Sequence, residues 1–218
     1  MLQALQRLAA AEWKSRCRII GLDHWEAARQ NKRPVVLAYC HFGPSFLLRE
    51  WLRAAGLPVA VYVRTLFGER TKAKWLKNRV ALLPEVPSAI FRDQLRDLSA
   101  FLAAGNVLLI AVDHDSGRQI ELPAGGDWTF RMTTGAIRIA ARHNAELIPC
   151  SIIDEGNWRF CIELGRPIAA RHLGEDADLS AAGTLLLQEL LAQFRPQPAQ
   201  CTKKLAERFT PVVPETDS

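Results

Sequence analysis

The sequence lacks the long apolar run that a membrane-spanning helix requires. A transmembrane helix needs about 20 consecutive apolar residues, and no run in these 218 residues approaches that length. The first residues also lack the form of a signal peptide, because Arg7 interrupts them and no long apolar core follows. We therefore expect a protein that is soluble or peripheral to a membrane.

The cysteines lack the number and the spacing of a disulfide framework or a metal site. The chain has five cysteines, an odd number without a C-x-x-C pair, which argues against a disulfide framework and against a zinc site. Cys40 and Cys150 end apolar runs and Cys161 lies inside one, so we interpret them as small buried hydrophobic residues. Free thiols of this kind favour a reducing compartment.

Two functional classes lack their usual signatures. No block of Lys and Arg with interleaved aromatic residues is present, which disfavours nucleic-acid binding. No G-x-S-x-G sequence is present either, which disfavours an α/β-hydrolase with a serine nucleophile. The net charge of +5 and the pI of about 9.1 suit an anionic membrane surface, a phosphate-bearing substrate or an acidic carrier protein.

What the chain does contain is a series of apolar runs that alternate with helical patterns. Its 218 residues, 49% of them hydrophobic, suffice for one domain with a substantial core, and no internal repeat or linker is visible. Strands separated by helices predict a mostly parallel central sheet flanked by helices, so we expect a single α/β domain over residues 1–218. The expected strands are 35–39, 59–63, 106–112, 145–152 and 158–164. The expected helices are 2–17, a short one within 21–28, 44–55, 71–78, 89–104, 133–143, 181–194 and 199–209.

Two local details complete this prediction. Asp23 is a plausible N-cap of the short helix, with Glu26 three residues later at the capping-box position. A Gly-rich loop is expected between Asp115 and the helix that begins near Thr133.

A histidine follows the first of the expected buried strands. Residues 34–48 are PVVLAYCHFGPSFLL, in which an apolar strand leads to His41, Gly43 permits a turn and a helical pattern begins at once. An α/β enzyme places a general base in this way, at the carboxyl end of a parallel strand. His41 is therefore the leading candidate for a catalytic base, although an isolated histidine is more often structural.

The residues around His41 resemble the first motif of the glycerolipid and lipid A late acyltransferases. In that motif four residues separate a histidine from a carboxylate. Further segments resemble motifs of the lipid A late acyltransferases, in the order that this family has them, and the membrane helix that precedes them in the family is expected to be missing here. The matching segments are GLDHWEAA at 21–28 with HFG at 41–43, DHDSG at 113–117, MTTG at 132–135 with RIA at 138–140, and AELIP at 145–149.

The resemblance implies a fold of the glycerolipid acyltransferase type and transfer of an acyl group from a thioester. In the family the histidine removes the proton of the acceptor hydroxyl, and the carboxylate holds the imidazole in the correct tautomer. This chain departs from the pattern, because Phe46 stands at the position of the carboxylate.

Three carboxylates could replace the missing one. Glu50 lies one helical turn beyond Phe46, and its side chain would lean back toward the helix start. Asp113 and Asp115 follow another expected strand, whose carboxyl end would share a crevice with His41. The alternative for Glu50 is a surface ion pair with Arg49 or Arg53.

The resemblance also suggests residues that bind substrate. His114 replaces a glutamine of the family motif, Thr134 and Gly135 belong to a second motif, and Arg79 is the nearest candidate for a substrate-binding arginine. Arg79 ends a basic stretch that suits a phosphate or phosphopantetheine group, or else forms a solvated helix face. The histidines and aspartates would also suit zinc, but the family pattern has no metal and we expect none.

Two functions remain open. The first is an acyltransferase that uses acyl carrier protein or acyl-CoA as co-substrate, needs no cofactor, and acylates a hydroxyl or amine of a small molecule or a lipid. The second, which Phe46 favours, is a catalytically degenerate homologue that binds lipid or a carrier protein. Either would be cytoplasmic, with peripheral contact to the inner face of the membrane as an open alternative.

Overall fold

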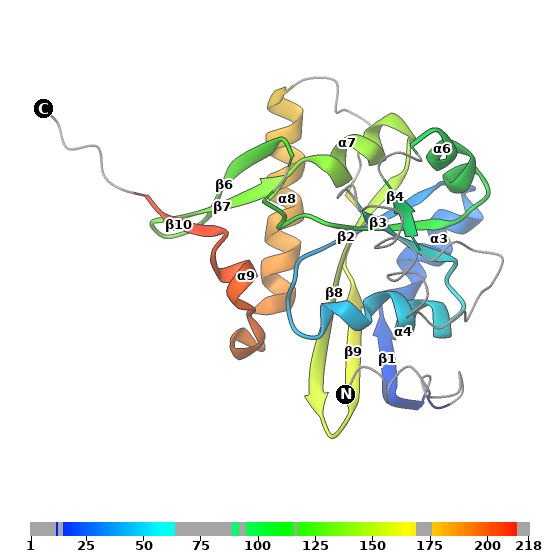
Figure 1. Cartoon of the computed structure of the whole chain (residues 1–218), viewed down its shortest axis with the longest axis horizontal. Helices are drawn as coiled ribbons and strands as arrows, with labels where there is room; N and C mark the ends of the chain where they lie inside the picture. Colours follow the sequence, from blue (N-terminus) through cyan, green and yellow to red (C-terminus); the bar gives the residue numbers. More distant parts are fainter. Residues whose placement is uncertain are drawn as a thin grey trace, which may run out of the picture.

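A seven-stranded sheet forms the centre of the structure (Figure 1). The computed structural model describes residues 12, 15–63, 89–91, 95–115, 117–168 and 176–212. The strand order is β1-β9-β8-β2-β5-β3-β4, and every neighbouring pair is parallel except β8 and β9. The predicted α/β architecture with a mostly parallel sheet is confirmed. The strands are β1 (Cys17–Ile20), β2 (Val35–Tyr39), β3 (Val59–Val63), β4 (Ala89–Phe91), β5 (Val107–Ala111), β8 (Glu146–Gly156) and β9 (Arg159–Leu164).

Hydrophobic cores lie on both faces of this sheet. Successive side chains of a strand point to opposite faces, so Val35 and Leu37 of β2 join one core whereas Val36 and Ala38 join the other. The helices α3 (Leu22–Gln30) and α4 (Leu48–Ala54) contribute to the first core. The second core contains side chains of α6 (Leu95–Ala103), α7 (Gly135–Arg142) and α8 (Asp176–Phe194). Because β2 and β5 are covered on both sides, they are the central strands that their apolar runs predicted.

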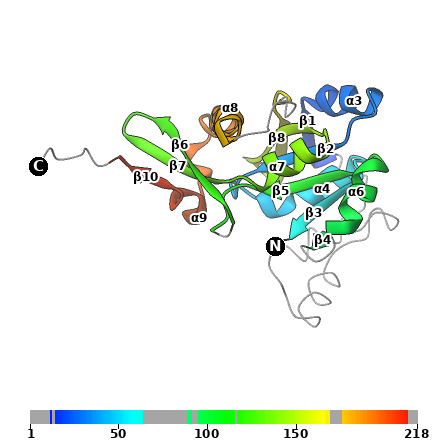
Figure 2. The same ribbon diagram turned by 90° about the horizontal axis from the view of Figure 1, so that it is seen from above.

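A second, smaller sheet extends beyond α8 (Figure 2). It is antiparallel, with the order β10-β7-β6, and consists of β6 (Gln119–Gly125), β7 (Trp128–Thr133) and β10 (Phe209–Pro211). The expected Gly-rich loop is therefore wrong, because most of it is the β6–β7 hairpin. Only one side of β6 packs against α8, and few of its residues, such as Leu122, are buried. The sequence of β6 therefore lacks the apolar run by which the other strands were predicted.

Two predicted helices are partly wrong. The predicted helix 89–104 begins only at Leu95, because Ala89–Phe91 is the strand β4, which pairs in parallel with β3. A short apolar run does not distinguish a strand from a helix. The predicted helix 199–209 is divided into η4 (Pro198–Gln200), α9 (Lys203–Ala206) and β10, because Cys201 and Thr202 have extended backbones.

The start of α3 also differs from its prediction. Gly21 is the N-cap, in a left-handed conformation, and Asp23 lies inside the first turn without a side-chain cap hydrogen bond. A carboxylate in that turn still interacts favourably with the helix dipole. Of the predicted helix 2–17, only its last residues are described, and Cys17 already begins β1; the predicted helix 71–78 lies outside the described residues.

Within the part of the chain that the structure describes, no helix is long and apolar enough to cross a membrane.

Gly43, in the turn after β2, tests how tightly this turn is packed. Its φ of +52° is left-handed, and an added Cβ would lie 2.5 Å from the carbonyl oxygen of Ile152. Gly56 has a φ of +93° and nothing within 4 Å of a Cβ. We expect Gly56→Ala to lower the free energy of unfolding by about 1–2 kcal/mol through backbone strain alone, and Gly43→Ala to lower it by about 2–4 kcal/mol. Urea denaturation of both variants measures the difference, and equal losses would contradict the packing.

Candidate functional site

His41 and Asp113 lie at the carboxyl ends of two neighbouring strands. In the parallel pairing of β2 with β5, Tyr39 is opposite Ala111. The same register, continued by two residues, brings His41 opposite Asp113. The Asp113 carboxylate uses both oxygens on this histidine: Oδ1 lies 2.7 Å from the ring Nδ1, and Oδ2 accepts the backbone N–H of His41 at 2.8 Å.

The electrostatics of this pair fix its protonation. Asp113 is 0% exposed. Burial alone would raise the pKa of this carboxyl, but the hydrogen bonds and charge of His41, with the charge of Lys204, outweigh it and lower the pKa. Asp113 is therefore a carboxylate at neutral pH and can only accept hydrogen bonds. The proton of a neutral His41 then resides on Nδ1, and the lone pair on Nε2 faces away from Asp113.

The backbone of the His41 turn is held by a distant part of the chain. The N–H of Gly43 donates to the carbonyl oxygen of Gln200 at 2.9 Å, and the Thr202 hydroxyl donates to the carbonyl oxygen of His41. Phe42 is buried and stacks on Phe194 of α8, with ring centroids 4.2 Å apart. The turn is thus fixed by residues from the last part of the described chain.

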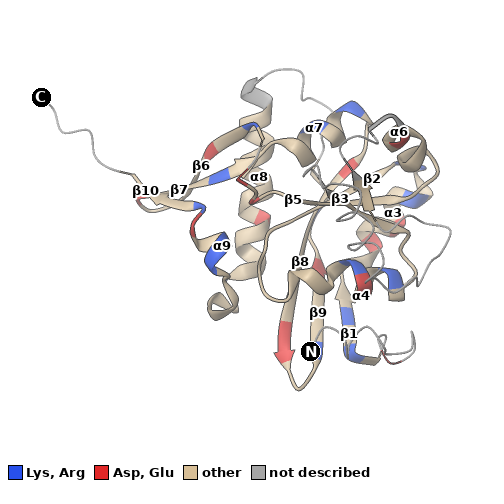
Figure 3. Cartoon of the chain, viewed as in Figure 1, with Lys and Arg blue, Asp and Glu red and all other residues tan. Residues whose placement is uncertain are grey.

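Lys204 is the residue of this site that sequence reasoning missed. Its Nζ lies 3.4 Å from Nε2 of His41 and 3.5 Å from Nδ1 of His114 (Figure 3 shows the basic residues of α9). No spacing connects a lysine near the end of the chain with a histidine 163 residues earlier. The only sequence signal was two adjacent lysines at 203 and 204.

His114 is an exposed residue beside His41. Its ring packs edge-on against that of His41, with centroids 5.3 Å apart. Partial burial, followed by the charges of Lys204 and His41, lowers its pKa. His114 is therefore a neutral side chain at neutral pH that can donate or accept a hydrogen bond.

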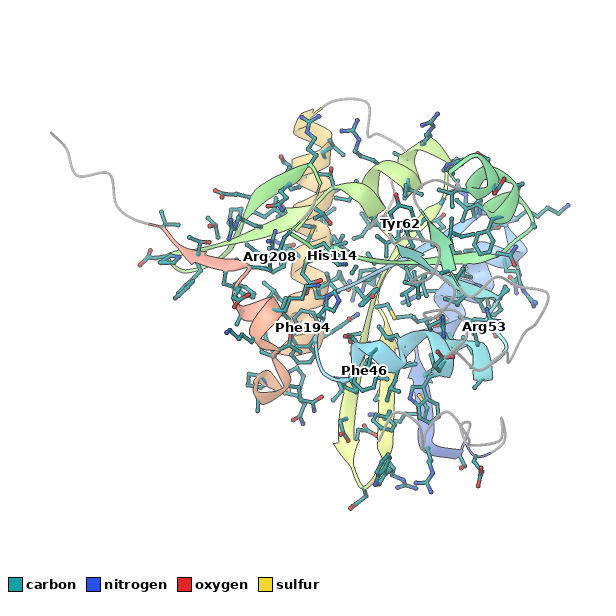
Figure 4. The ribbon with its side chains drawn as sticks, in the orientation of Figure 1. Phe46, Arg53, Tyr62, His114, Phe194 and Arg208 are labelled. Carbon is teal, nitrogen blue, oxygen red and sulfur yellow. The ribbon has the colours of Figure 1, made fainter. Side chains whose placement is uncertain are left out.

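The other two candidate carboxylates pair with arginine side chains. Asp115 accepts a hydrogen bond from Nη1 of Arg208 at 2.9 Å (Figure 4). Glu50 is buried on α4 and pairs with Arg49, which is one of the two partners considered from the sequence, although the pair is buried and not on the surface. The structure thus brings Asp113, and not Glu50, to the imidazole. Glu50 joins the first core because every residue of the short helix α4 is buried.

Thr134 and Gly135 lie at the start of α7, and Thr134 supports the loop after β5. The Thr134 hydroxyl and N–H both donate to the carbonyl oxygen of Arg118, at 3.3 and 3.0 Å. Thr133 makes the same pair of contacts to Val112, the residue before Asp113. This motif thereby holds Asp113 in position. Arg79 lies outside the described residues.

Phe46 faces outward next to an apolar hollow. It is 44% exposed on η1 (Ser45–Leu47), the short turn that precedes α4 (Figure 4). A hollow of about 400 Å³ lies beside this turn. Its lining residues are Pro44, Leu47, Asp154, Gly156, Asn157, Trp158 and Phe160. Among the described residues, no group of three or more His, Cys, Asp or Glu side chains could hold a metal ion.

Comparison with known proteins identifies the family. The family model of the bacterial lipid A biosynthesis acyltransferases matches residues 1–201. The chain belongs to this family. Lys204 lies just beyond the matched residues. A search of the curated proteins finds no match.

The fold is similar to that of a solved acyltransferase. The crystal structure of the 1-acyl-sn-glycerophosphate (LPA) acyltransferase PlsC from Thermotoga maritima superposes with a TM-score of 0.52 at 12% sequence identity. The match covers 93% of this chain and 80% of PlsC. At this identity the similarity concerns the fold, and it agrees with the family assignment.

The pair of His41 and Asp113 predicts a pH-dependent stability. A carboxyl whose pKa is lowered by folding adds stability above its ordinary pKa of about 4 and loses that contribution as the pH falls through the folded value. We expect Asp113→Asn to lower the free energy of unfolding by about 2 kcal/mol near neutral pH. The deficit should shrink below about pH 4, where wild type loses the same contribution.

Urea denaturation across this pH range measures the deficit. Asp127→Asn, on the exposed turn between β6 and β7, is the matched control for the replacement of an aspartate by asparagine. A deficit for Asp113→Asn that stays constant down to pH 3 would contradict the lowered pKa of Asp113.

Proposed function

We propose that this family member moves an acyl group from a thioester donor to a hydroxyl or amine acceptor, with His41 as the general base. The observation that carries the proposal is the 2.7 Å contact between Nδ1 of His41 and the Asp113 carboxylate. A general base needs a carboxylate or similar acceptor on the far ring nitrogen, because that partner fixes the tautomer and stabilises the imidazolium that forms. Family membership supplies the reaction class.

The chemistry follows from this arrangement. Nε2 of His41 takes the proton of the acceptor as its oxygen or nitrogen attacks the thioester carbon. The resulting imidazolium is stabilised by Asp113, which is already ionised and dry. When the tetrahedral intermediate collapses, the C–S bond breaks and the imidazolium returns the proton to the leaving thiolate.

Phe46 does not prevent this mechanism. The imidazole needs an acceptor at Nδ1, and Asp113 supplies one from the neighbouring strand, so a carboxylate at position 46 is dispensable. In this proposal Asp113 has replaced the missing carboxylate of the motif. Phe46, exposed beside the apolar hollow, instead contacts substrate or a membrane surface.

Donor and acceptor are proposed by chemistry alone. Acyl carrier protein and acyl-CoA both present a thioester on a phosphopantetheine arm, and both are anionic partners that suit a net charge of +5. Arg79, His114, Thr134 and Gly135 are proposed to bind substrate, and Thr134 also holds the loop that follows Asp113. The acceptor is a lipid or a small molecule, and we propose a cytoplasmic protein with peripheral contact to the inner face of the membrane.

The exposed Phe46 also favours a second candidate function. A noncatalytic homologue would use the apolar hollow to bind acyl chains or a carrier protein. In that case acyl ligands would bind, but no thioester would be consumed by wild-type protein.

Substitution of either member of the pair tests the catalytic proposal. Wild type, His41→Ala and Asp113→Asn are incubated with a panel of acyl-carrier and acyl-CoA thioesters and candidate acceptors, and products are identified by mass spectrometry. We expect each variant to lose about 10²–10⁴-fold in rate. His41→Ala removes the base, and Asp113→Asn leaves the imidazole in the wrong tautomer. His143→Ala, at the end of α7, is the control histidine and should keep wild-type turnover. Full activity in His41→Ala would remove this residue from the mechanism, and acyl binding without turnover in wild type would favour the second function.

Restoring the family carboxylate tests the replacement by Asp113. Because Nδ1 of His41 already has an acceptor, Phe46→Glu should not raise turnover in the wild-type background. In the Asp113→Asn background the same change should recover part of the lost rate if the new carboxylate reaches the ring. A rise in turnover in the wild-type background would show that Asp113 orients His41 poorly.

A further inference from the structure

The last part of the described chain crosses the proposed active site and is fixed there at both ends. We define the C-terminal segment as residues 200–208, which include α9. At its first end, the carbonyl oxygen of Gln200 accepts the N–H of Gly43, and the backbone of Cys201 forms an antiparallel β-bridge with Phe42. The Thr202 hydroxyl donates to the carbonyl oxygen of His41. The same hydroxyl accepts the N–H of Leu205 at 3.2 Å and so caps α9. The start of α9 is therefore bonded directly to the His41 turn.

The other end of the segment is bonded to the loop after β5 and to β7. Arg208 is buried, and its Nη1 donates to Asp115 at 2.9 Å while its Nε donates to the carbonyl oxygen of Arg131 at 3.0 Å. Leu205, between the two ends, is fully buried in the second core. A helix of four residues that is held at both ends and in the middle has little freedom to move.

This anchoring determines where the two adjacent lysines of α9 point. The side chain of Lys203 is 92% exposed and lies 3.9 Å from Glu207, an ordinary surface pair. Lys204 is half-buried, with its ammonium between the rings of His41 and His114. A lysine has three N–H donors and no acceptor, and both contacts are longer than the usual 2.7–3.2 Å of a hydrogen bond. Neither imidazole forms a short hydrogen bond with the ammonium, so a substrate oxygen can accept a hydrogen bond from it instead.

The charge balance of the proposed reaction assigns a use to this ammonium. In the resting site Asp113 carries one negative charge and Lys204 one positive charge. During attack the proton reaches His41, which becomes positive, and the thioester carbonyl oxygen becomes negative. Each of the two negative charges then has one cation beside it, Asp113 with His41 and the oxyanion with Lys204. Without Lys204 the oxyanion would develop with no positive partner among these groups.

We propose that Lys204 is a further catalytic residue, which donates a hydrogen bond from its ammonium to the carbonyl oxygen of the thioester as that oxygen becomes an oxyanion. The inference rests on the proposed acyl transfer. The acceptor oxygen or nitrogen forms its bond to the thioester carbon, the π electrons move to the carbonyl oxygen beside Lys204, and the acceptor proton moves to Nε2 of His41. When the C–S bond breaks, the electrons return to the carbonyl and the proton goes to the thiolate. Lys204 keeps its protons throughout.

Substitution of adjacent lysines provides the test. Lys204→Met removes the charge at nearly the same length, Lys204→Arg keeps it, and Lys203→Met is the matched control on the same turn of α9. Transfer from the acyl donor that wild type uses best is measured for each variant, with His41→Ala as the reference for loss of the base. Thermal unfolding of each variant confirms that the fold is retained.

We expect Lys204→Met to lower kcat by about 10²–10³-fold with little change in KM, as for the loss of one oxyanion donor. Lys204→Arg should keep part of this activity, and Lys203→Met should match wild type. NMR titration of His114 supplies a reading without turnover, because the pKa of His114 should rise in Lys204→Met when the neighbouring charge is removed.

Three results would overturn the inference. Wild-type kcat in Lys204→Met, with His41→Ala inactive, would exclude the lysine while leaving the proposed function intact. A raised KM with unchanged kcat would mean that Lys204 binds substrate equally in the ground state and the transition state. A faster Lys204→Met enzyme would mean that the ammonium shields the base. Inactivity of wild type would instead be a failure of the proposed function, and the NMR titration would then test the placement of the Lys204 charge by itself.

Discussion

The contact between Asp113 and His41 is the interaction on which the rest of the site depends. One buried carboxylate binds the ring of the histidine with one oxygen and its backbone N–H with the other. It therefore fixes the position of the residue, the orientation of the imidazole and the tautomer together. A buried carboxylate without such partners would be costly. The pair therefore stabilises the contact between the ends of β2 and β5, in addition to any role in the reaction. The two threonines that begin the α7 motif hold the loop on the Asp113 side, and Thr202 holds the turn on the His41 side.

The origin of the carboxylate distinguishes this chain from the motif that its sequence resembles. In the motif four residues separate the histidine from the acid, whereas here the carboxylate that contacts His41 comes from the end of the adjacent strand. The orientation and tautomer of an imidazole depend on the distance and direction of its hydrogen-bond acceptor. They do not depend on which segment of the chain supplies that acceptor. Parallel pairing makes this substitution geometrically simple, because residues two positions beyond β2 and β5 are in register. Position 46 itself carries an exposed phenylalanine.

A second constraint comes from the C-terminal segment. Its contacts with His41 join residues that are 161 and 163 positions apart, so the turn that carries His41 is held by a segment far away in sequence. The small sheet shares in this arrangement, because β10 pairs with β7 and Arg208 bonds to Arg131 within it. The site is therefore built at the junction of the central sheet, the hairpin and α9, although its first motif is a contiguous stretch of sequence.

The sequence by itself determined the features that depend on local pattern. The apolar runs of β2 and β5 predicted two central strands. The strand, turn and helix pattern around His41 predicted a general base at the carboxyl end of β2, and the ordered motifs predicted the family. The local pattern did not predict the β6–β7 hairpin, which is buried on one side only. It also did not predict β4, which has only three residues. The sequence left three candidate carboxylates as the partner of His41. It does not state that β2 and β5 are neighbours, which decides in favour of Asp113. It also does not state how α4 packs, which decides that Glu50 is buried against Arg49. Only the tertiary structure selected Asp113 and brought Lys204 to the imidazole. Those contacts join distant segments, and their geometry is set by strand order and by the docking of the chain end, for which no local spacing carries information.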